Sequence, residues 1–112
     1  MASAVKVVPI NMDAIAREYS TKVRAALGDR VRDIILFGSR ARGEQKKFSD
    51  YDVLIVVDKR DREIVKTIRK IAVEMLDEYE RLIGNIVYDV DEWERKKTFP
   101  FGINIKREGL RM

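Results

Sequence analysis

The chain has 112 residues, 46% hydrophobic and 38% charged, which predicts one compact domain over residues 1–112 with a small core and a very polar surface. It contains neither cysteine nor histidine, which excludes disulfide bonds, zinc and iron–sulfur sites, thiol nucleophiles and any catalytic triad built on histidine. The net charge of +4 is compatible with an anionic partner such as a nucleotide, a nucleic acid or an acidic protein.

The sequence carries no signal of a membrane protein. No apolar run approaches the roughly 18 residues that a membrane-spanning helix needs. The N-terminus lacks the long apolar segment of a secretory signal peptide. We therefore expect a cytoplasmic protein that does not enter a membrane.

The first half of the chain predicts one helix and two strands. Apolar residues recur at helical spacing over residues 12–27, and either Asn11 or Asp13 can cap the helix. Residues 31–37 and 50–57 are rich in β-branched and other apolar side chains, as in buried strands. We expect these two strands to pair.

The second half predicts a long helix and a third strand. Residues 58–82 place apolar side chains on one helical face and charges on the other, and residues 86–90 have the composition of a short strand. Residues 98–112 hold one proline and two glycines, and their pattern predicts no element. The order of elements indicates an α/β (α+β) domain, a small mixed sheet with helices packed on one side.

Two aspartates open the second strand. Because strand side chains alternate, Asp50 and Asp52 point to the same face, while Tyr51 points to the other. Two neighbouring carboxylates repel each other unless a proton or a cation lies between them. In a chain without histidine or cysteine, Mg²⁺ or Mn²⁺ is the natural partner. The alternative is an ordinary turn acid followed by a strand-opening acid at a solvated edge.

A glycine-containing basic turn precedes these acids. Gly38 lets the backbone approach a ligand closely, and Ser39 supplies a hydroxyl and an amide, either as a helix cap or as a phosphate contact. Arg40 and Arg42 add positive charge where a polyphosphate would lie, although both could be solvated surface charges. Acids that hold a metal beside a turn that holds phosphate suit phosphoryl or nucleotidyl transfer.

These residues resemble a known family. Gly38-Ser39, ten residues, then Asp50-x-Asp52 matches the G-S-x10-D-x-D pattern of the nucleotidyltransferase superfamily that includes DNA polymerase beta. The flanking letters LFGSRARGE and the R-E-G of residues 107–109 are similar to the minimal nucleotidyltransferases. Many of those are paired with a helical HEPN-domain protein in toxin–antitoxin operons.

The resemblance implies that Gly38 and Ser39, with Arg40 and Arg42, bind a nucleoside triphosphate. It also implies that the two aspartates of the motif hold the metal ion and act in catalysis.

In such enzymes a third acid on a neighbouring strand completes the metal site and helps to activate the acceptor hydroxyl. Asp89 is the candidate here, by alternation along the third strand, as a third metal ligand and catalytic residue. Relatives usually place that acid nearer the start of the strand, which falls at Gly84-Asn85. The alternative role for Asp89 is to cap the turn that follows.

The activity implied is magnesium-dependent transfer of a nucleoside monophosphate, AMP from ATP, to a hydroxyl acceptor, with a tyrosine of a partner toxin of the HEPN type as the acceptor. The alternative is a non-catalytic antitoxin subunit of the same fold that binds nucleotide or protein. Nucleic acid binding through the basic surface is a weaker alternative, and a homo-oligomer is compatible with the sequence. The aromatic residues Trp93, Phe99 and Phe101 could form a nucleobase platform, part of the core or a partner surface.

Overall fold

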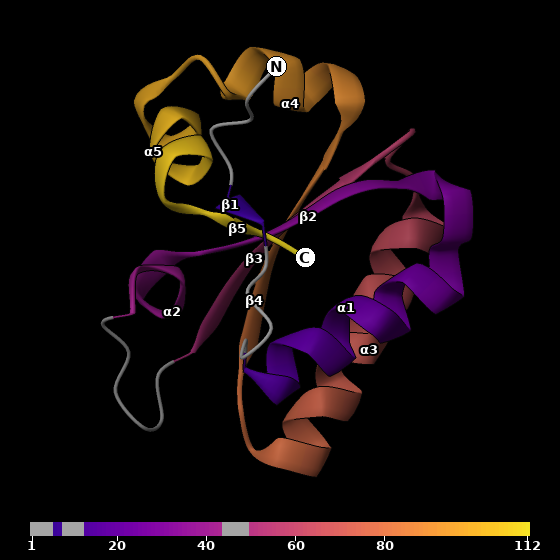
Figure 1. The fold of residues 1–112 in the computed structure, drawn as a ribbon. Helices are drawn as coiled ribbons and strands as arrows, with labels where there is room; N and C mark the ends of the chain where they lie inside the picture. Colours follow the sequence, from indigo (N-terminus) through magenta and orange to yellow (C-terminus); the bar gives the residue numbers. More distant parts are fainter. Residues whose placement is uncertain (1–5, 8–12, 44–49) are drawn as a thin grey trace.

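The structure is a computed structural model that describes residues 6–7, 13–43 and 50–112. One mixed β-sheet runs through the molecule, and helices lie on both of its faces (Figure 1). In chain order the elements are β1 (Lys6–Val7), α1 (Ala14–Leu27), a 3₁₀ turn η1 (Gly28–Arg30), β2 (Val31–Phe37), α2 (Gly38–Arg42), β3 (Tyr51–Val57), α3 (Arg62–Tyr79), β4 (Ile83–Asp89), α4 (Val90–Lys96), α5 (Pro100–Glu108) and β5 (Leu110–Arg111).

The sheet has the strand order β1-β5-β2-β3-β4. Strand β2 is antiparallel to both of its neighbours, β3 and β5, whereas β3 and β4 are parallel. The predicted pairing of the first two long strands is therefore confirmed. Helix α3 forms the crossover between β3 and β4, which leaves β4 at one edge of the described sheet.

Helices α1 and α3 cover one face of the sheet. Their apolar sides pack on alternate residues of β2 and β3, and α3 has the amphipathic pattern expected from the sequence. Asp13 caps α1 by accepting a hydrogen bond from the Ile15 backbone amide at 2.8 Å, and Asn11 lies outside the described residues. This core includes Tyr19, Val23, Ile34, Leu36, Val53, Ile55, Ile64, Ile68 and Met75.

The opposite face of the sheet is covered by the short C-terminal helices. Ile105 of α5 packs against Ile35, Leu54 and Val56, and Trp93 of α4 joins the edge of this second core. The expectation of helices on one side is corrected in this respect, because the segment that the sequence left unassigned supplies a second layer. The physical reason lies in β2 and β3, whose central residues are apolar on both faces and need cover on both.

Among the residues that the structure describes, no helix combines the length and the apolar character needed to cross a bilayer.

Candidate active site

The glycine turn and the acid pair meet at one end of the sheet. Phe37, the last residue of β2, pairs in register with Asp52 of β3, so Gly38 follows immediately beside that aspartate. Gly38 has a φ of +73°, and a Cβ at this position would overlap Oδ2 of Asp52. Only glycine fits both the backbone conformation and the contact. The two halves of the motif are thus in direct contact.

Asp52 lies half-buried on the face of the sheet that carries α4 and α5. It shares this face with Leu54 and Val56, while Tyr51 is buried on the face of α1 and α3. Asp50 precedes β3 and is exposed. Burial raises the pKa of Asp52, the negative charge of Asp50 raises it further, and the positive charge of Arg42 partly offsets both effects. The folded protein therefore holds a carboxylate whose charge is not fully compensated.

The chemistry of this pair fits a hard divalent cation. Mg²⁺ is commonly held by one or two carboxylates together with water and substrate phosphate oxygens. Asp50 and Asp52 supply such carboxylates, and a cation between them would relieve their repulsion. Within the described ranges, no group of three or more acidic, histidine or cysteine side chains is arranged to hold a metal ion. The site thus offers two protein carboxylates.

The structure does not bring Asp89 to this pair. In the parallel register of β3 and β4, Asp52 pairs with Gly84, whereas Asp89 pairs with Val57 at the other end of the strand. Five residues of strand separate the two levels, a distance of about 17 Å. The prediction of Asp89 as the third acid is corrected for this reason.

Asp89 instead caps helix α4. Its Oδ1 accepts a hydrogen bond from the backbone amide of Glu92 at 2.8 Å, and Oε1 of Glu92 accepts one from the backbone amide of Asp89 at 3.0 Å. This reciprocal pair is a capping box, which satisfies two amides of the first turn. The alternative role stated for this residue is the one that the structure supports.

Gly84 occupies the position beside Asp52 on β4. A Cβ built on Gly84 would lie 3.9 Å from Oδ1 of Asp52. Asn85, the next residue, points to the opposite face, where its Oδ1 accepts a hydrogen bond from the Tyr19 hydroxyl at 2.6 Å. The position on β4 that is level with Asp52 therefore has no side chain in this protein.

Arg40 belongs to the opposite face of the sheet from Asp52. Its side chain is only 7% exposed, its Nη1 lies 3.0 Å from Oδ2 of Asp13, and its guanidinium carbon lies 4.0 Å from the centre of the Tyr51 ring. The Tyr51 hydroxyl donates a hydrogen bond to the same Asp13 oxygen at 2.6 Å. The expectation that Arg40 binds nucleotide is corrected to a structural role, because these contacts direct its charge away from the acid pair.

Arg42 is the arginine that lies on the side of the acids. Its charge acts on Asp52, and its Nη1 donates to Oε2 of Glu108 in α5 at 3.4 Å. Ser39 lies in the first turn of α2 rather than at its cap, since Phe37 holds the N-cap position and makes no side-chain hydrogen bond there. Arg42 thus lies on the side of the acid pair, and Ser39 lies in the turn that directly follows Gly38.

A cleft of about 260 Å³ opens beside Gly38. The rings of Phe37 and Phe101 meet edge to face on its wall, with centroids 5.7 Å apart. Trp93 is not part of it, because this ring stacks on Tyr88 in the core. The cleft is lined by Phe37, Gly38, Arg42, Phe101, Asn104, Ile105 and Glu108.

Sequence reasoning missed two polar residues of this cleft, Asn104 and Glu108. Both lie on α5, within the segment that the sequence left unassigned. A signal was present, because Pro100 stands at the first position of the helix, where proline is favoured.

Comparison with known proteins points to one family. The family model described as a nucleotidyltransferase domain matches residues 16–109. "Putative protein adenylyltransferase MJ0604" of Methanocaldococcus jannaschii is 30% identical over 100 residues, which cover 89% of this chain and 96% of that protein. "Putative protein adenylyltransferase MJ0141" of the same organism is 40% identical over 79 residues, 66% of this chain and 76% of the relative.

Solved structures share the fold. A crystal structure of a "putative nucleotidyltransferase from Sulfolobus solfataricus" aligns with a TM-score of 0.53 and 24% identity, covering 91% of this chain and 79% of that one. A structure described as "the toxin-antitoxin with AMP-PNP" aligns with a TM-score of 0.57 and 18% identity, covering 84% of this chain and 69% of the other. At these identities the likeness concerns the fold alone.

Proposed function

Because this chain belongs to the nucleotidyltransferase domain family, we propose that it transfers AMP from ATP to a hydroxyl group of a partner protein, with Mg²⁺ or Mn²⁺ held by Asp50 and Asp52. The observation that carries the proposal is the contact of Gly38 with Asp52, which joins the phosphate turn to the acid pair. The names of the relatives as protein adenylyltransferases support a protein as the acceptor.

Each residue of the proposed site has a distinct task. Asp50 and Asp52 bind the cation, whose charge would neutralise the phosphates and stabilise the leaving pyrophosphate. The backbone at Gly38 and Ser39 approaches the phosphate oxygens, and the Arg42 guanidinium adds a charge-assisted contact. The cleft beside Gly38 has room for part of the nucleoside, with the Phe101 ring as an apolar wall.

The proposed reaction forms a bond between the α-phosphorus and the acceptor oxygen and breaks the bond from that phosphorus to the β-phosphate oxygen. Pyrophosphate leaves, and the proton of the acceptor hydroxyl must pass to a base. Gly84 leaves no carboxylate beside Asp52 for that proton on β4. In this proposal water or a group of the acceptor protein takes it.

The proposed acceptor is a tyrosine of a helical partner of the HEPN type. This part rests on the resemblance of the motif to the minimal nucleotidyltransferases and on toxin–antitoxin complexes among the proteins of similar fold.

The test is label transfer from α-labelled ATP. The full chain is incubated with Mg²⁺, the labelled nucleotide and a candidate helical partner of the HEPN type, and label on that protein is measured. We expect transfer by the wild type and its loss in Asp52→Asn. Asp89→Asn is the matched control, because it changes an aspartate outside the site and asparagine still caps a helix. Absence of label with the wild type, or equal label with Asp52→Asn, would refute the proposal.

A second candidate is a non-catalytic subunit that binds nucleotide without transferring it. The glycine at position 84 favours this candidate, because a hydroxyl acceptor would lack a protein base on β4. Calorimetry with ATP and Mg²⁺ separates the two. Binding of nucleotide without label transfer to any partner indicates the non-catalytic subunit, and binding with transfer indicates the enzyme.

A further inference from the structure

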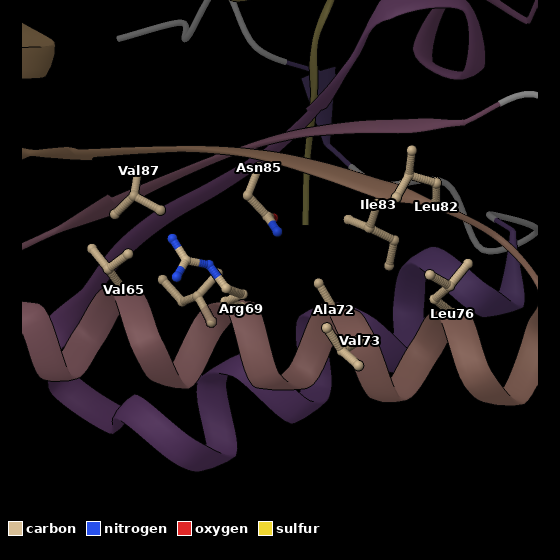
Figure 2. A pocket seen from close by; sticks show the side chains of 10 residues that line it. Val65, Arg69, Ala72, Val73, Leu76, Leu82, Ile83, Asn85 and Val87 are labelled. Carbon is tan, nitrogen blue, oxygen red and sulfur yellow. The ribbon is translucent and has the colours of Figure 1, made fainter.

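An apolar groove lies between helix α3 and the edge strand β4, away from the proposed active site. Figure 2 shows Val65 and Ala72 pointing from α3 toward Val87 and Ile83 of β4. The groove has a volume of about 310 Å³. It lies on the face of the sheet that carries α1 and α3, whereas Asp52 faces the opposite layer.

The rim of this groove exposes large apolar side chains. Val73 and Leu82 are 51% and 52% exposed, and Leu76 is 40% exposed. Beside them, the outer edge of β4 pairs with no other strand among the described residues. An apolar rim next to a free strand edge is a surface that proteins usually cover.

A line of exposed residues, all but one of them charged, runs along α3 beside the groove. Its members are spaced by four, three, four, four and three residues, so those from Arg62 to Asp77 share one exposed side of the helix, and Glu80 is the exposed C-cap residue that follows. None of its charged members forms an ion pair with another described residue. This α3 stripe consists of Arg62, Lys66, Arg69, Val73, Asp77 and Glu80.

The order of charges along the stripe opposes the helix dipole. The N-terminal end of a helix favours acidic side chains and the C-terminal end favours basic ones. Here the three basic residues of the stripe come first and the two acidic residues last. Stability of the isolated helix does not explain this order, whereas pairing with another surface does.

We propose that the α3 stripe and the adjoining groove form the interface between two copies of this chain, related by a two-fold axis that passes between Arg69 and Val73. In that arrangement the two α3 helices run antiparallel. Residues at equal distances from the axis then face each other, which places Arg62 opposite Glu80 of the partner subunit and Lys66 opposite Asp77 of the partner subunit.

The stripe is complementary to itself, which favours a second copy over a foreign helix. A two-fold interface uses the same patch on both subunits, so a patch that is basic at one end and acidic at the other matches itself when antiparallel. The exposed apolar residues Val73 and Leu76 lie near the middle and the charges toward the ends, as in interfaces with an apolar centre and a polar rim. The proposed active site stays open in this dimer, so the inference does not depend on the proposed function.

A charge exchange tests the pairing. The association of the full chain is measured by sedimentation equilibrium, and Lys66→Glu and Asp77→Lys are each expected to raise the dimer dissociation constant about tenfold, since each creates two repulsive pairs across the axis. The double variant Lys66→Glu/Asp77→Lys should return to within about threefold of the wild type. Within one chain these residues lie about 16 Å apart along the helix, so they cannot rescue each other directly.

The control is Arg32→Glu, an exposed charge on β2, which should leave the dissociation constant unchanged. Folding is checked by thermal melting at a dilution where the wild-type chain is monomeric, because loss of the dimer alone lowers the melting temperature, and there neither α3 variant should melt markedly lower. A wild-type chain that stays monomeric at about 0.1 mM, where weak specific interfaces are populated, would overturn the proposal. So would single variants that dissociate without rescue in the double variant, or a monomeric chain whose stripe binds a different protein.

Discussion

Substituting aspartate for Gly84 should turn the two-carboxylate site into one with three. The register of β3 and β4 places residue 84 directly beside Asp52. A Cβ there would lie 3.8 Å from the Tyr51 carbonyl oxygen and 3.9 Å from Oδ1 of Asp52, which are ordinary contacts. Gly84 is also absent from the glycines with positive φ, so its backbone accepts a side chain. The new carboxylate can therefore reach a cation bound to Asp52.

The expected gain in metal affinity follows from Coulomb's law. A single negative charge about 4 Å from a divalent cation contributes about 2 kcal/mol at the dielectric constant of water, or about thirtyfold in dissociation constant. Without metal the same charge, about 5 Å from Asp52, costs about 1 kcal/mol in water-like surroundings. That cost lowers the melting temperature by about 4 °C for a domain of this size.

The assay is calorimetric titration of Mn²⁺ into the full chain, with and without a non-hydrolysable ATP analogue. Gly84→Asn is the matched control, since it adds the same volume without the charge. We expect Gly84→Asp to bind Mn²⁺ about thirtyfold more tightly than Gly84→Asn, and to melt lower than that variant before Mn²⁺ is added.

Equal Mn²⁺ affinity in the aspartate and asparagine variants would refute the reasoning, because it would mean that residue 84 does not face the metal-binding carboxylates. Label transfer gives a second readout. A gain of transfer in Gly84→Asp, from a wild type that transfers none, would identify the natural chain as the non-catalytic subunit.

Three further predictions concern Asp52 and Gly38 at the proposed site and Asp89 at the other end of the sheet. Asp52→Asn should raise the free energy of unfolding at pH 7 without metal, because the raised pKa of Asp52 means that its charged form is disfavoured in the folded state. The difference from wild type should shrink as pH falls through the ordinary aspartate pKa of about 3.9 and vanish below about pH 3, where the residue is protonated in both states. Urea titrations at several pH values measure it, and an asparagine variant less stable at pH 7 contradicts the prediction. Gly38→Ala should lose more than about 1 kcal/mol and weaken Mn²⁺ binding, since its Cβ overlaps Asp52. Gly43→Ala is its control, with a similar φ of +74° and no atom within 4 Å, and equal losses in thermal melts would count against the contact. Asp89→Ala should cost about 1 kcal/mol by removing a helix cap while calorimetry shows unchanged binding of ATP and Mn²⁺; weaker binding would return this residue to the site.

The sequence predicted the centre of the site because the motif itself contains the geometry. Gly38 ends one strand and Asp52 begins the next, and a direct antiparallel pairing of those strands brings the two together whatever the intervening loop does. Alternation then placed Tyr51 on the opposite face, where the structure has it.

The errors came from residues whose partners lie in distant elements. Charge alone does not reveal which face of a short helix Arg40 occupies, since that depends on Asp13 at the start of α1. Gly84 and Asn85 favoured a helix end, so the third strand was expected to begin at residue 86 instead of Ile83. The residue level with Asp52 is Gly84, which carries no acid, so alternation along the strand left Asp89 as the candidate.

The contacts of helix α2 bear on how the proposed site would respond to an anionic ligand. Two arginines of this helix contact other elements, and they differ in burial. Arg40 is nearly enclosed between Asp13 and the Tyr51 ring, whereas Arg42 lies 3.4 Å from Glu108 in a solvent-exposed ion pair. Exposed ion pairs contribute little to stability, so exchanging Glu108 for a phosphate as a partner of Arg42 would lose little from this one pair. Arg40 would meanwhile keep the backbone of Gly38 and Ser39 in place, so the turn is preorganised and loses little conformational entropy when it takes up a ligand.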